Sequence, residues 1–284
     1  MVKRLEFARQ PIYVIADTHG EFNNMIKKIN QYDIKDCIIV ICGDVGIGFY
    51  SKNFYENTLE YLNNECLYRH INLLMIRGNH DDPYYFNNKV FSYSNVELLE
   101  DYTILTVGND NILCVGGAIS IDRLYRLETD SKRVSNTLTQ LLYDNPKATE
   151  EEAIRKTIPS YWVDEKPTYD EEKLNYINNL SINIDYVLTH TSPSFCFKKD
   201  KNGVSEWMKY DNFLEKDLNY EREVFTKIYD FLTENNNIIK KWVYGHFHES
   251  NNEKINGTDF IALINSDFYF QYTLLNSEDD IETF

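Results

Sequence analysis

Residues 71–82 read INLLMIRGNHDD, a short apolar run that ends in glycine, asparagine, histidine and two aspartates. The apolar part, residues 71–76, has the length of a buried β-strand and stops abruptly at polar side chains. In open α/β sheets, such side chains at the carboxyl end of a strand form the binding site. This stretch therefore predicts a strand that carries Asn79 and His80 to a site at the edge of a sheet.

The same pattern occurs twice upstream. Residues 11–16 (PIYVIA) run into DTHG, and residues 37–42 (CIIVIC) run into GD. Apolar residues at helical spacing follow each strand, over residues 21–31 and roughly 54–68. Strands that alternate with helices in this order indicate an α/β fold with a parallel sheet and right-handed crossovers.

After residue 82 the sequence predicts short strands that continue in the antiparallel direction onto a second sheet, and an insertion. Residues 118–180 are the least regular part, apart from an amphipathic helix near 149–156, and we interpret them as an inserted cap or lid within a single domain, 1–284. The polar stretches 175–183 and 198–210 indicate surface loops, and residues 221–232 indicate a helix. The further candidate strands are residues 96–99, 102–107, 112–115, 186–189, 242–244, 260–264 and 268–275.

Composition excludes several classes of protein. The 284 residues are 43% hydrophobic and 14% aromatic, which is ample for a packed core and opposes disorder. The net charge of −16, without a cluster of Lys and Arg, opposes nucleic-acid binding. The five cysteines form no CxxC pair, which excludes a zinc ribbon and indicates buried thiols in a reducing compartment. With no signal peptide and no apolar run of about 18 residues, we expect a soluble, cytoplasmic protein without membrane contact.

Side chains that bind metals recur where the predicted strands end. Five of the six histidines lie in these turns, and we expect the sixth, His70, to be structural. A single histidine at a strand end is usually an ordinary polar residue, but five beside aspartate and asparagine indicate a common cause. Carboxylate, amide and imidazole donors suit two divalent transition-metal ions, of which we favour Mn, with Fe, Zn and Ni as alternatives. The candidate ligands are Asp17, His19, Asp44, Asn79, His190, His246 and His248.

The order of these residues resembles the calcineurin-like metallophosphoesterase superfamily, and its small bacterial members in particular. The resemblance spans residues 17–248 and implies a four-layer αββα sandwich of two mixed sheets, with a dinuclear metal site at the strand ends. The blocks that carry it are Asp17-Thr18-His19, Gly43-Asp44, Gly78-Asn79-His80-Asp81, His190 and Gly245-His246-Phe247-His248.

The resemblance also implies a role for each residue. His80 would bind phosphate and protonate the leaving oxygen, while a metal-bridging hydroxide attacks phosphorus without a covalent intermediate. One ion would be held by Asp17, His19, Asp44 and His248. The other would be held by Asp44, Asn79, His190 and His246, so that Asp44 bridges the two ions.

Arg77 stands directly before the Gly-Asn-His block, as does the phosphate-binding arginine of the Ser/Thr protein phosphatases that this block resembles. The second block lacks the Asp-Arg-Gly found in those phosphatases, so the second arginine and the aspartate that would orient His80 are missing from their expected places. Asp81 or Asp82 could orient the imidazole instead.

The insertion offers further candidates for substrate binding. Arg123 and Arg126 could bind the substrate phosphate, and Trp162 could stack on a base or sugar. The alternatives are that both arginines pair with acidic neighbours and that Trp162 packs the insertion against the sandwich.

We therefore expect a metal-dependent phosphoric ester hydrolase that acts on a phosphate monoester or a small phosphodiester, with Asp44, Arg77 and His80 as catalytic residues. The substrate would be a phosphorylated small molecule, a nucleotide or a phosphoprotein. The alternatives are a nuclease or cyclic-nucleotide phosphodiesterase, and a metal-binding scaffold without activity. The acidic composition opposes a nuclease, and the complete ligand set opposes a scaffold.

Overall fold

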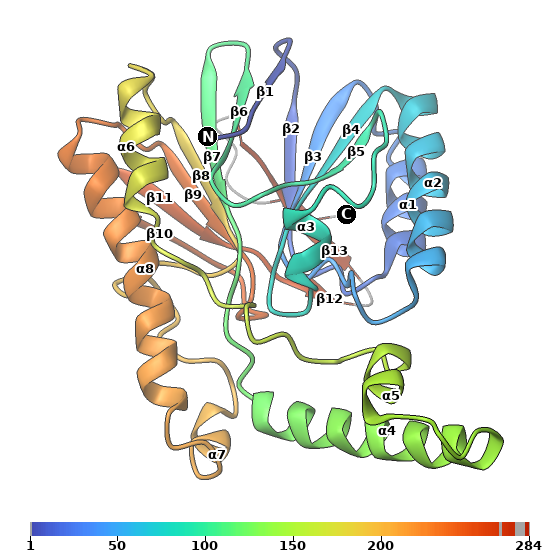
Figure 1. The fold of residues 1–284 in the computed structure, drawn as a ribbon. Helices are drawn as coiled ribbons and strands as arrows, with labels where there is room; N and C mark the ends of the chain where they lie inside the picture. Colours follow the sequence, from blue (N-terminus) through green and yellow to red (C-terminus); the bar gives the residue numbers. More distant parts are fainter. Residues whose placement is uncertain (1, 267–268, 276–281, 284) are drawn as a thin grey trace.

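Two β-sheets pack face to face in the computed structural model, and helices cover the outer face of each sheet (Figure 1). The structure describes residues 2–266, 269–275 and 282–283. The layers follow in the order helix, sheet, sheet, helix, so the four-layer αββα sandwich expected from the sequence is confirmed.

The first sheet is mixed, because β6 is antiparallel to β7, and β10 to β11, while the remaining pairs are parallel. In sheet order its strands are β1 (Arg4–Phe7), β6 (Thr103–Val107), β7 (Asp110–Val115), β8 (Tyr186–Thr189), β9 (Lys241–Tyr244), β11 (Thr258–Ala262) and β10 (Asn251–Ile255).

The second sheet has the three predicted parallel strands β2, β3 and β4. β5, which we expected in the antiparallel continuation onto the other sheet, instead pairs with β4 in the parallel direction, and β13 joins β2 in the antiparallel direction. A short strand, β14 (Glu282–Thr283), pairs with β13. In sheet order the other strands are β12 (Asn265–Ser266), β13 (Tyr269–Leu274), β2 (Ile12–Ile15), β3 (Cys37–Cys42), β4 (Ile71–Ile76) and β5 (Val96–Leu98).

β3 shows how the sequence produces these layers. All six of its residues are buried. Ile39 and Ile41 pack toward the outer helices, whereas Ile38 and Val40 lie between the two sheets. Because alternate residues of a strand point to opposite faces, a strand that is apolar on both faces belongs in the middle of a sandwich.

Helices α1 (Phe22–Gln31) and α2 (Lys52–Arg69) cover the second sheet, and α6 (Glu171–Asn179) and α8 (Leu214–Glu234) cover the first. The α2 helix begins after Ser51, whose hydroxyl accepts a hydrogen bond from the Phe54 N–H at 3.3 Å. It ends at His70 in the left-handed conformation. His70 is therefore the C-cap of a helix, which agrees with the structural role expected for it.

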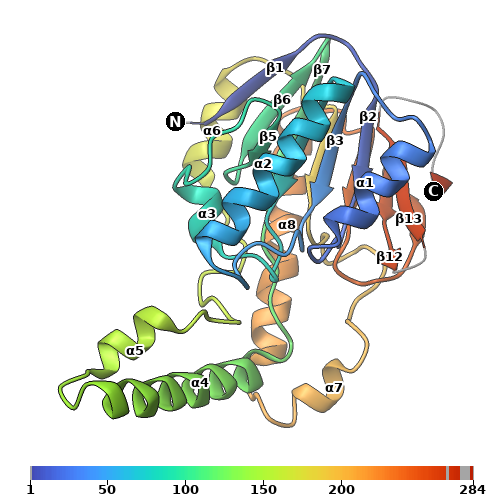
Figure 2. The same ribbon diagram turned by 90° about the vertical axis from the view of Figure 1, so that its right-hand side faces the viewer.

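Helices α4 (Arg123–Asp144) and α5 (Glu150–Lys156) project from the sandwich as a hairpin (Figures 1 and 2). We call residues 121–164, which include both helices, the arm. None of the 22 residues of α4 is buried. The predicted insertion, 118–180, thus holds the arm, but it also holds α6, which packs Leu174 and Ile177 against the first sheet.

Two short helices, α3 (Pro83–Asn87) and α7 (Val204–Trp207), lie in connections between larger elements. The five cysteines are all free and buried. Among the described residues, no helix combines the length and the apolar character needed to cross a lipid bilayer.

Candidate dinuclear metal centre

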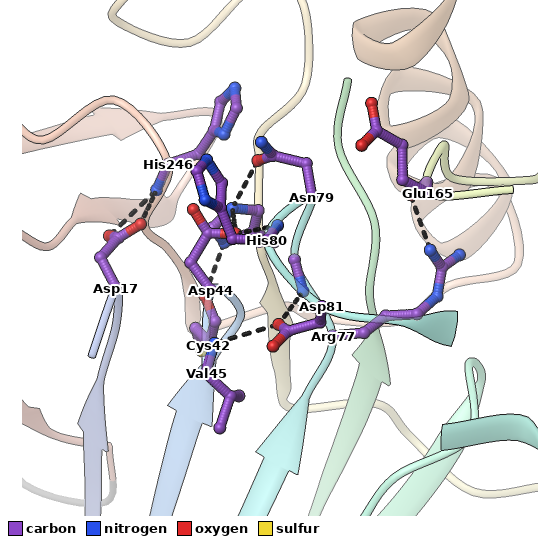
Figure 3. Close-up of polar contacts among 12 residues, drawn as sticks. Asp17, Cys42, Asp44, Val45, Arg77, Asn79, His80, Asp81, Glu165 and His246 are labelled. Atoms are coloured by element: carbon purple, nitrogen blue, oxygen red, sulfur yellow. Dashed lines mark hydrogen bonds and ion pairs between the residues drawn. The ribbon is translucent and has the colours of Figure 1, made fainter. Parts of the chain in front are cut away.

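Strands from both sheets deliver the predicted ligands to one edge of the sandwich (Figure 3). Within the second sheet, Asp17, Asp44 and Asn79 lie just beyond the carboxyl ends of β2, β3 and β4. Within the first sheet, His190 follows β8 directly, and His246 stands two residues beyond β9. Because these strands run parallel within each sheet, their ends place residues that are far apart in sequence side by side.

Four of the predicted ligands form a compact group. Ligand atoms of Asp17, His19, Asp44 and His248 all lie within 4.8 Å of one another. His19 Nε2 is 3.8 Å from Asp44 Oδ2, and His248 Nε2 is 3.7 Å from Asp17 Oδ1. The two carboxylates are buried and the two imidazoles are partly exposed, so the group is open to solvent on its histidine side. This is the set of residues expected to hold one ion.

The second predicted set surrounds the other oxygen of Asp44. His190 Nε2 lies 3.2 Å from Asp44 Oδ1 and 3.3 Å from Asn79 Oδ1. The rings of His190 and His246 are 5.0 Å apart between centroids. His190 Nδ1 is 2.9 Å from the carbonyl oxygen of Cys42, which fixes the ring and turns Nε2 toward the cluster. Asp44 belongs to both sets, as a bridging ligand must.

Two atoms test whether this cluster suits metal ions. Asp44 Oδ2 and His246 Nδ1 are buried without a hydrogen-bond partner in the described part of the chain. A buried polar atom left without a partner costs about 1–3 kcal/mol, so such atoms need a ligand. Two carboxylates, one amide and four imidazoles form the mixed nitrogen and oxygen donor set of divalent transition ions. The residues present therefore fit a pair of such ions.

The backbone at the ligands is strained in a consistent way. Asp17, His19, Asp44, His246 and His248 all have positive φ, between 45° and 69°. Non-glycine residues rarely adopt this conformation, and such strain concentrates at functional sites. Each turn holds its ligand at an angle that an ordinary strand end would not provide.

The residue before Asp44 shows why a glycine is needed here. Gly43 has φ of +80°, and a Cβ at this position would lie 2.2 Å from His190 Nδ1. Any larger residue would displace the imidazole of His190. The glycine therefore allows β3 and β8, from different sheets, to bring their ligands into contact.

Charges within the cluster set the protonation of its members. Burial would raise the pKa of Asp44, but its histidine neighbours, His190 first, hold that pKa well below its usual value. Burial would lower the pKa of His190, but Asp44 raises it to about 9. Burial also holds the pKa of His246 well below its usual value. Asp44 is thus a carboxylate and His246 a neutral imidazole, the forms that bind a cation.

His80 lies beside the cluster and contacts Arg126 from the arm. Its Nε2 is 3.0 Å from Arg126 Nη2, and its ring packs edge-on against that of His19 at 5.1 Å. Because a guanidinium only donates hydrogen bonds, Nε2 of His80 is the acceptor. Burial, followed by smaller contributions that include Arg126, lowers the pKa of His80 to about 4. The imidazole is therefore neutral in this state.

The two aspartates after His80 have separate roles. The Asp81 carboxylate accepts hydrogen bonds from the N–H groups of Val45, Gly46, Ile47 and Gly78 at 2.7–3.0 Å. Asp82 caps α3 by accepting from the Tyr84 N–H at 2.9 Å. Neither carboxylate is hydrogen-bonded to the His80 ring in the described structure. Asp81 instead fixes the loop that carries Asp44.

The other predicted substrate-binding residues lie in different surroundings. The guanidinium of Arg77 is buried, pairs with Asp101 at 2.7 Å and donates to backbone carbonyls of residues 164–166. Arg123 pairs with Asp211 at 2.5 Å and with Asp217 at 2.6 Å. The structure thus brings Arg126 to the cluster, but it directs Arg77 and Arg123 toward other partners. Phosphate binding by these two arginines stays a prediction.

Two further residues near the site belong to regions that the sequence left undefined. Trp162 is buried and packs against Phe49 at 5.1 Å between ring centroids, as the packing alternative requires. Lys201, in a stretch expected to be a surface loop, contributes a positive charge that lowers the pKa of His246 and His248 after the larger effect of burial. No sequence signal marked Lys201, because a loop brings it to the site.

An αββα sandwich with this donor set at its strand ends defines a metal-dependent hydrolase. A family model described as calcineurin-like phosphoesterase matches residues 10–250, and the chain belongs to that family. It is accordingly a metal-dependent phosphoesterase of the calcineurin-like type. No curated protein sequence matches the chain.

A solved structure shows the same fold at low sequence identity. A dimetal phosphatase from Danio rerio is 12% identical, with a TM-score of 0.52, over 96% of this chain and 98% of that one, and at this identity the likeness concerns the fold alone. A weaker match is a phosphopantetheinyl hydrolase from Mycobacterium tuberculosis, which is 15% identical, with a TM-score of 0.37, over 89% of each chain.

Proposed function

We propose that this chain hydrolyses a phosphate monoester or a small phosphodiester at a centre of two divalent ions. The observation that carries the proposal is the convergence of seven ligand-type side chains. Two of them, Asp44 and His246, present buried atoms that have no hydrogen-bond partner among the described residues. Asp17, His19, Asp44 and His248 would hold one ion, and Asp44, Asn79, His190 and His246 the other. We favour Mn²⁺, although Fe, Zn and Ni suit the same donors.

Two divalent ions, when bound, supply charge that neutralises the phosphate and lower the pKa of the water that attacks it. The chain supplies binding and proton transfer. Arg126 reaches His80 from the arm, is 14% exposed at its side chain, and is held there by Asp122 at 2.8 Å. We propose that its guanidinium binds a phosphate oxygen of the substrate.

His80 would then donate a proton to the leaving oxygen. In the substrate-free state the Arg126 guanidinium and burial keep this imidazole neutral. A bound phosphate brings negative charge beside the ring and takes up the donors of Arg126, and both effects favour the protonated imidazole. Substrate binding would therefore prepare the general acid.

The substrate class that we favour is a phosphorylated small molecule, a nucleotide or a phosphoprotein. The net charge of −16 supports a compact substrate over a nucleic acid. The five free, buried cysteines support a cytoplasmic location. The chain would act as one domain, with the inserted arm beside its active centre.

The test is hydrolysis of p-nitrophenyl phosphate and bis-p-nitrophenyl phosphate, with Mn²⁺ and with EDTA. Asp44→Asn and His80→Ala should abolish Mn²⁺-dependent turnover, and Arg126→Ala should lower kcat/KM by roughly 10²–10³-fold. Arg133→Ala, on the exposed side of α4, is the matched control and should change neither rate. The ratio of the two rates separates a monoesterase from a diesterase.

The proposal fails if no divalent ion supports turnover of either ester while two ions per chain are bound. That result would favour the metal-binding scaffold. Turnover that persists in Asp44→Asn would show that the reaction occurs elsewhere on the molecule.

A further inference from the structure

The two ends of the arm meet beside Asn79, one of the predicted metal ligands. Ser120 precedes the arm and Glu165 follows it, and both are buried. The Ser120 N–H donates to Glu165 Oε1 at 2.6 Å, and the Ser120 hydroxyl donates to Glu165 Oε2 at 2.8 Å. Forty-four residues of chain leave the sandwich between these two positions and return to the same point.

The same hydroxyl contacts a predicted metal ligand. Asn79 Nδ2 donates to Ser120 Oγ at 3.0 Å, while Asn79 Oδ1 faces His190 Nε2 at 3.3 Å. An amide has a donor side and an acceptor side of almost the same shape, so its hydrogen-bond partners decide which side faces the ion. Only the oxygen side can bind a metal ion.

Glu165 is itself held in place by a buried cation. Arg77 Nη1 donates to the Glu165 carbonyl oxygen at 2.6 Å (Figure 3). Arg77 Nη2 pairs with Asp101 at 2.7 Å. The turn at Gly117 makes room for this contact, because a Cβ there would lie 2.8 Å from the same carbonyl oxygen. The backbone of Glu165 is therefore held between the Arg77 guanidinium and the turn at Gly117.

We propose that Glu165 and Ser120 form a relay that fixes the polarity of the Asn79 amide and so completes the site of the second ion. In its ionised form Glu165 can only accept, so the Ser120 proton turns toward it and the hydroxyl oxygen accepts from Asn79. Asn79 must then present its oxygen to the cluster. Arg77 and Asp101 position Glu165, and the second ion binds well only when both ends of the arm are in place. This inference rests on the metal centre proposed above.

The substitution Glu165→Gln tests the relay with almost no change in shape. Its amide oxygen would accept from the Ser120 N–H, and its NH₂ group would then donate to the Ser120 hydroxyl. The hydroxyl proton has to turn toward position 79, where only the amide oxygen of Asn79 can accept it. Asn79 would flip and point its NH₂ group at the second ion.

The measurement is a calorimetric titration of the metal-free full-length chain with Mn²⁺ at pH 9 under argon. Burial raises the pKa of Glu165 to about 8, so this pH keeps the side chain a carboxylate. Glu165→Gln should lower the affinity for the second ion by roughly 10–100-fold and leave the affinity for the first ion unchanged, as do substitutions of residues that hydrogen-bond to metal ligands. Glu150→Gln, on the exposed surface of α5, is the matched control and should bind both ions as the parent chain does.

A double substitution separates the orientation of the Asn79 amide from a general loss of folding stability. In Asn79→Asp both side-chain terminal atoms are oxygens, so either can face the ion. Adding Glu165→Gln to this variant should therefore cause no further loss of affinity for the second ion. Ser120→Ala removes the hydroxyl and should also weaken the binding of the second ion. It serves as the test variant if Glu165→Gln is too unstable to purify. The thermal unfolding midpoint of each metal-free variant reports folding.

The outcomes are distinguishable. Binding of two ions by Glu165→Gln or Ser120→Ala with the affinity of the parent chain would overturn the relay, and so would an equal loss in the Asn79→Asp background. A parent chain that binds fewer than two ions would instead overturn the proposed metal centre.

Discussion

At the scale of single residues, Asp81 explains how the chain holds the bridging ligand without the Asp-Arg-Gly sequence of the protein phosphatases. Its carboxylate accepts hydrogen bonds from three N–H groups of the loop after β3 and from one N–H group of the loop after β4. Asp44 lies between these N–H groups and the cluster. A single buried carboxylate therefore ties the two metal-bearing turns together.

Asp81→Asn should lower the free energy of unfolding by about 2–3 kcal/mol, because the amide NH₂ would face backbone N–H groups and leave them without an acceptor. Asp82→Asn is the matched control and should cost less than about 0.5 kcal/mol, since asparagine caps helices as well as aspartate does. Urea unfolding of the metal-free chains at pH 9 gives both values, because burial raises the pKa of Asp81 only to about 7. Equal losses in the two variants would contradict this role.

The clustering of the candidate metal ligands could be predicted from the sequence, whereas the residues behind them could not. The candidate ligands lie within a few residues of the ends of apolar strands, and parallel strands place their ends at one edge. Ser120 and Glu165 reach the site through the path of a loop, which no periodicity encodes. Arg77 has a phosphatase-like position in the sequence, yet its direction depends on Asp101 and on a backbone 88 residues away.

At the scale of elements, predictions succeeded where a local sequence signal marks the element. The helix expected near 149–156 is α5, which begins with a capping box between Thr149 and Glu152. We expected irregular chain over the arm helix α4, although apolar residues recur there at helical spacing, namely Leu124, Leu127, Val134, Leu138 and Leu141; none of its residues is buried. Likewise α6, which packs only Leu174 and Ile177, overlaps the loop expected over 175–183.

The central strands should carry the stability of the fold. Ile38→Ala in β3 removes a fully buried side chain between the sheets and should cost about 2–5 kcal/mol of unfolding free energy. Ile154→Ala in α5 makes the same chemical change at a side chain that is 54% exposed, and it should cost less than about 0.5 kcal/mol. Urea unfolding measures both, and a comparable loss in α5 would mean that the arm folds as part of the core.

At the scale of the whole molecule, a buried acid should make stability depend on pH. Glu221 of α8 is buried and accepts from the Ile119 N–H at 2.5 Å. Burial raises its pKa in the folded chain from 4.5 to about 7. The folded chain therefore keeps a proton that the unfolded chain releases, and this contribution to stability is lost as pH rises through about 7.

Glu221→Gln keeps the hydrogen-bond acceptor and removes the titration. The loss of stability between pH 4.5 and pH 8 should be about 3 kcal/mol smaller than in the parent chain. Thermal unfolding of the metal-free protein across this range measures the difference. Glu223→Gln, at an exposed neighbouring position, should keep the slope of the parent, and an unchanged slope in Glu221→Gln would contradict the assignment.

The fold, the family and the cluster of candidate ligands converge on a metal-dependent phosphoesterase. We propose that it needs two ions at once, because Asp44 lies between the two predicted ligand sets. The most direct measurement is the turnover of p-nitrophenyl phosphate while Mn²⁺ is added in known equivalents to the metal-free chain. We expect almost no turnover up to one equivalent, a steep rise toward two equivalents and a plateau beyond. Full turnover at one equivalent, or turnover that survives EDTA, would contradict a dinuclear centre.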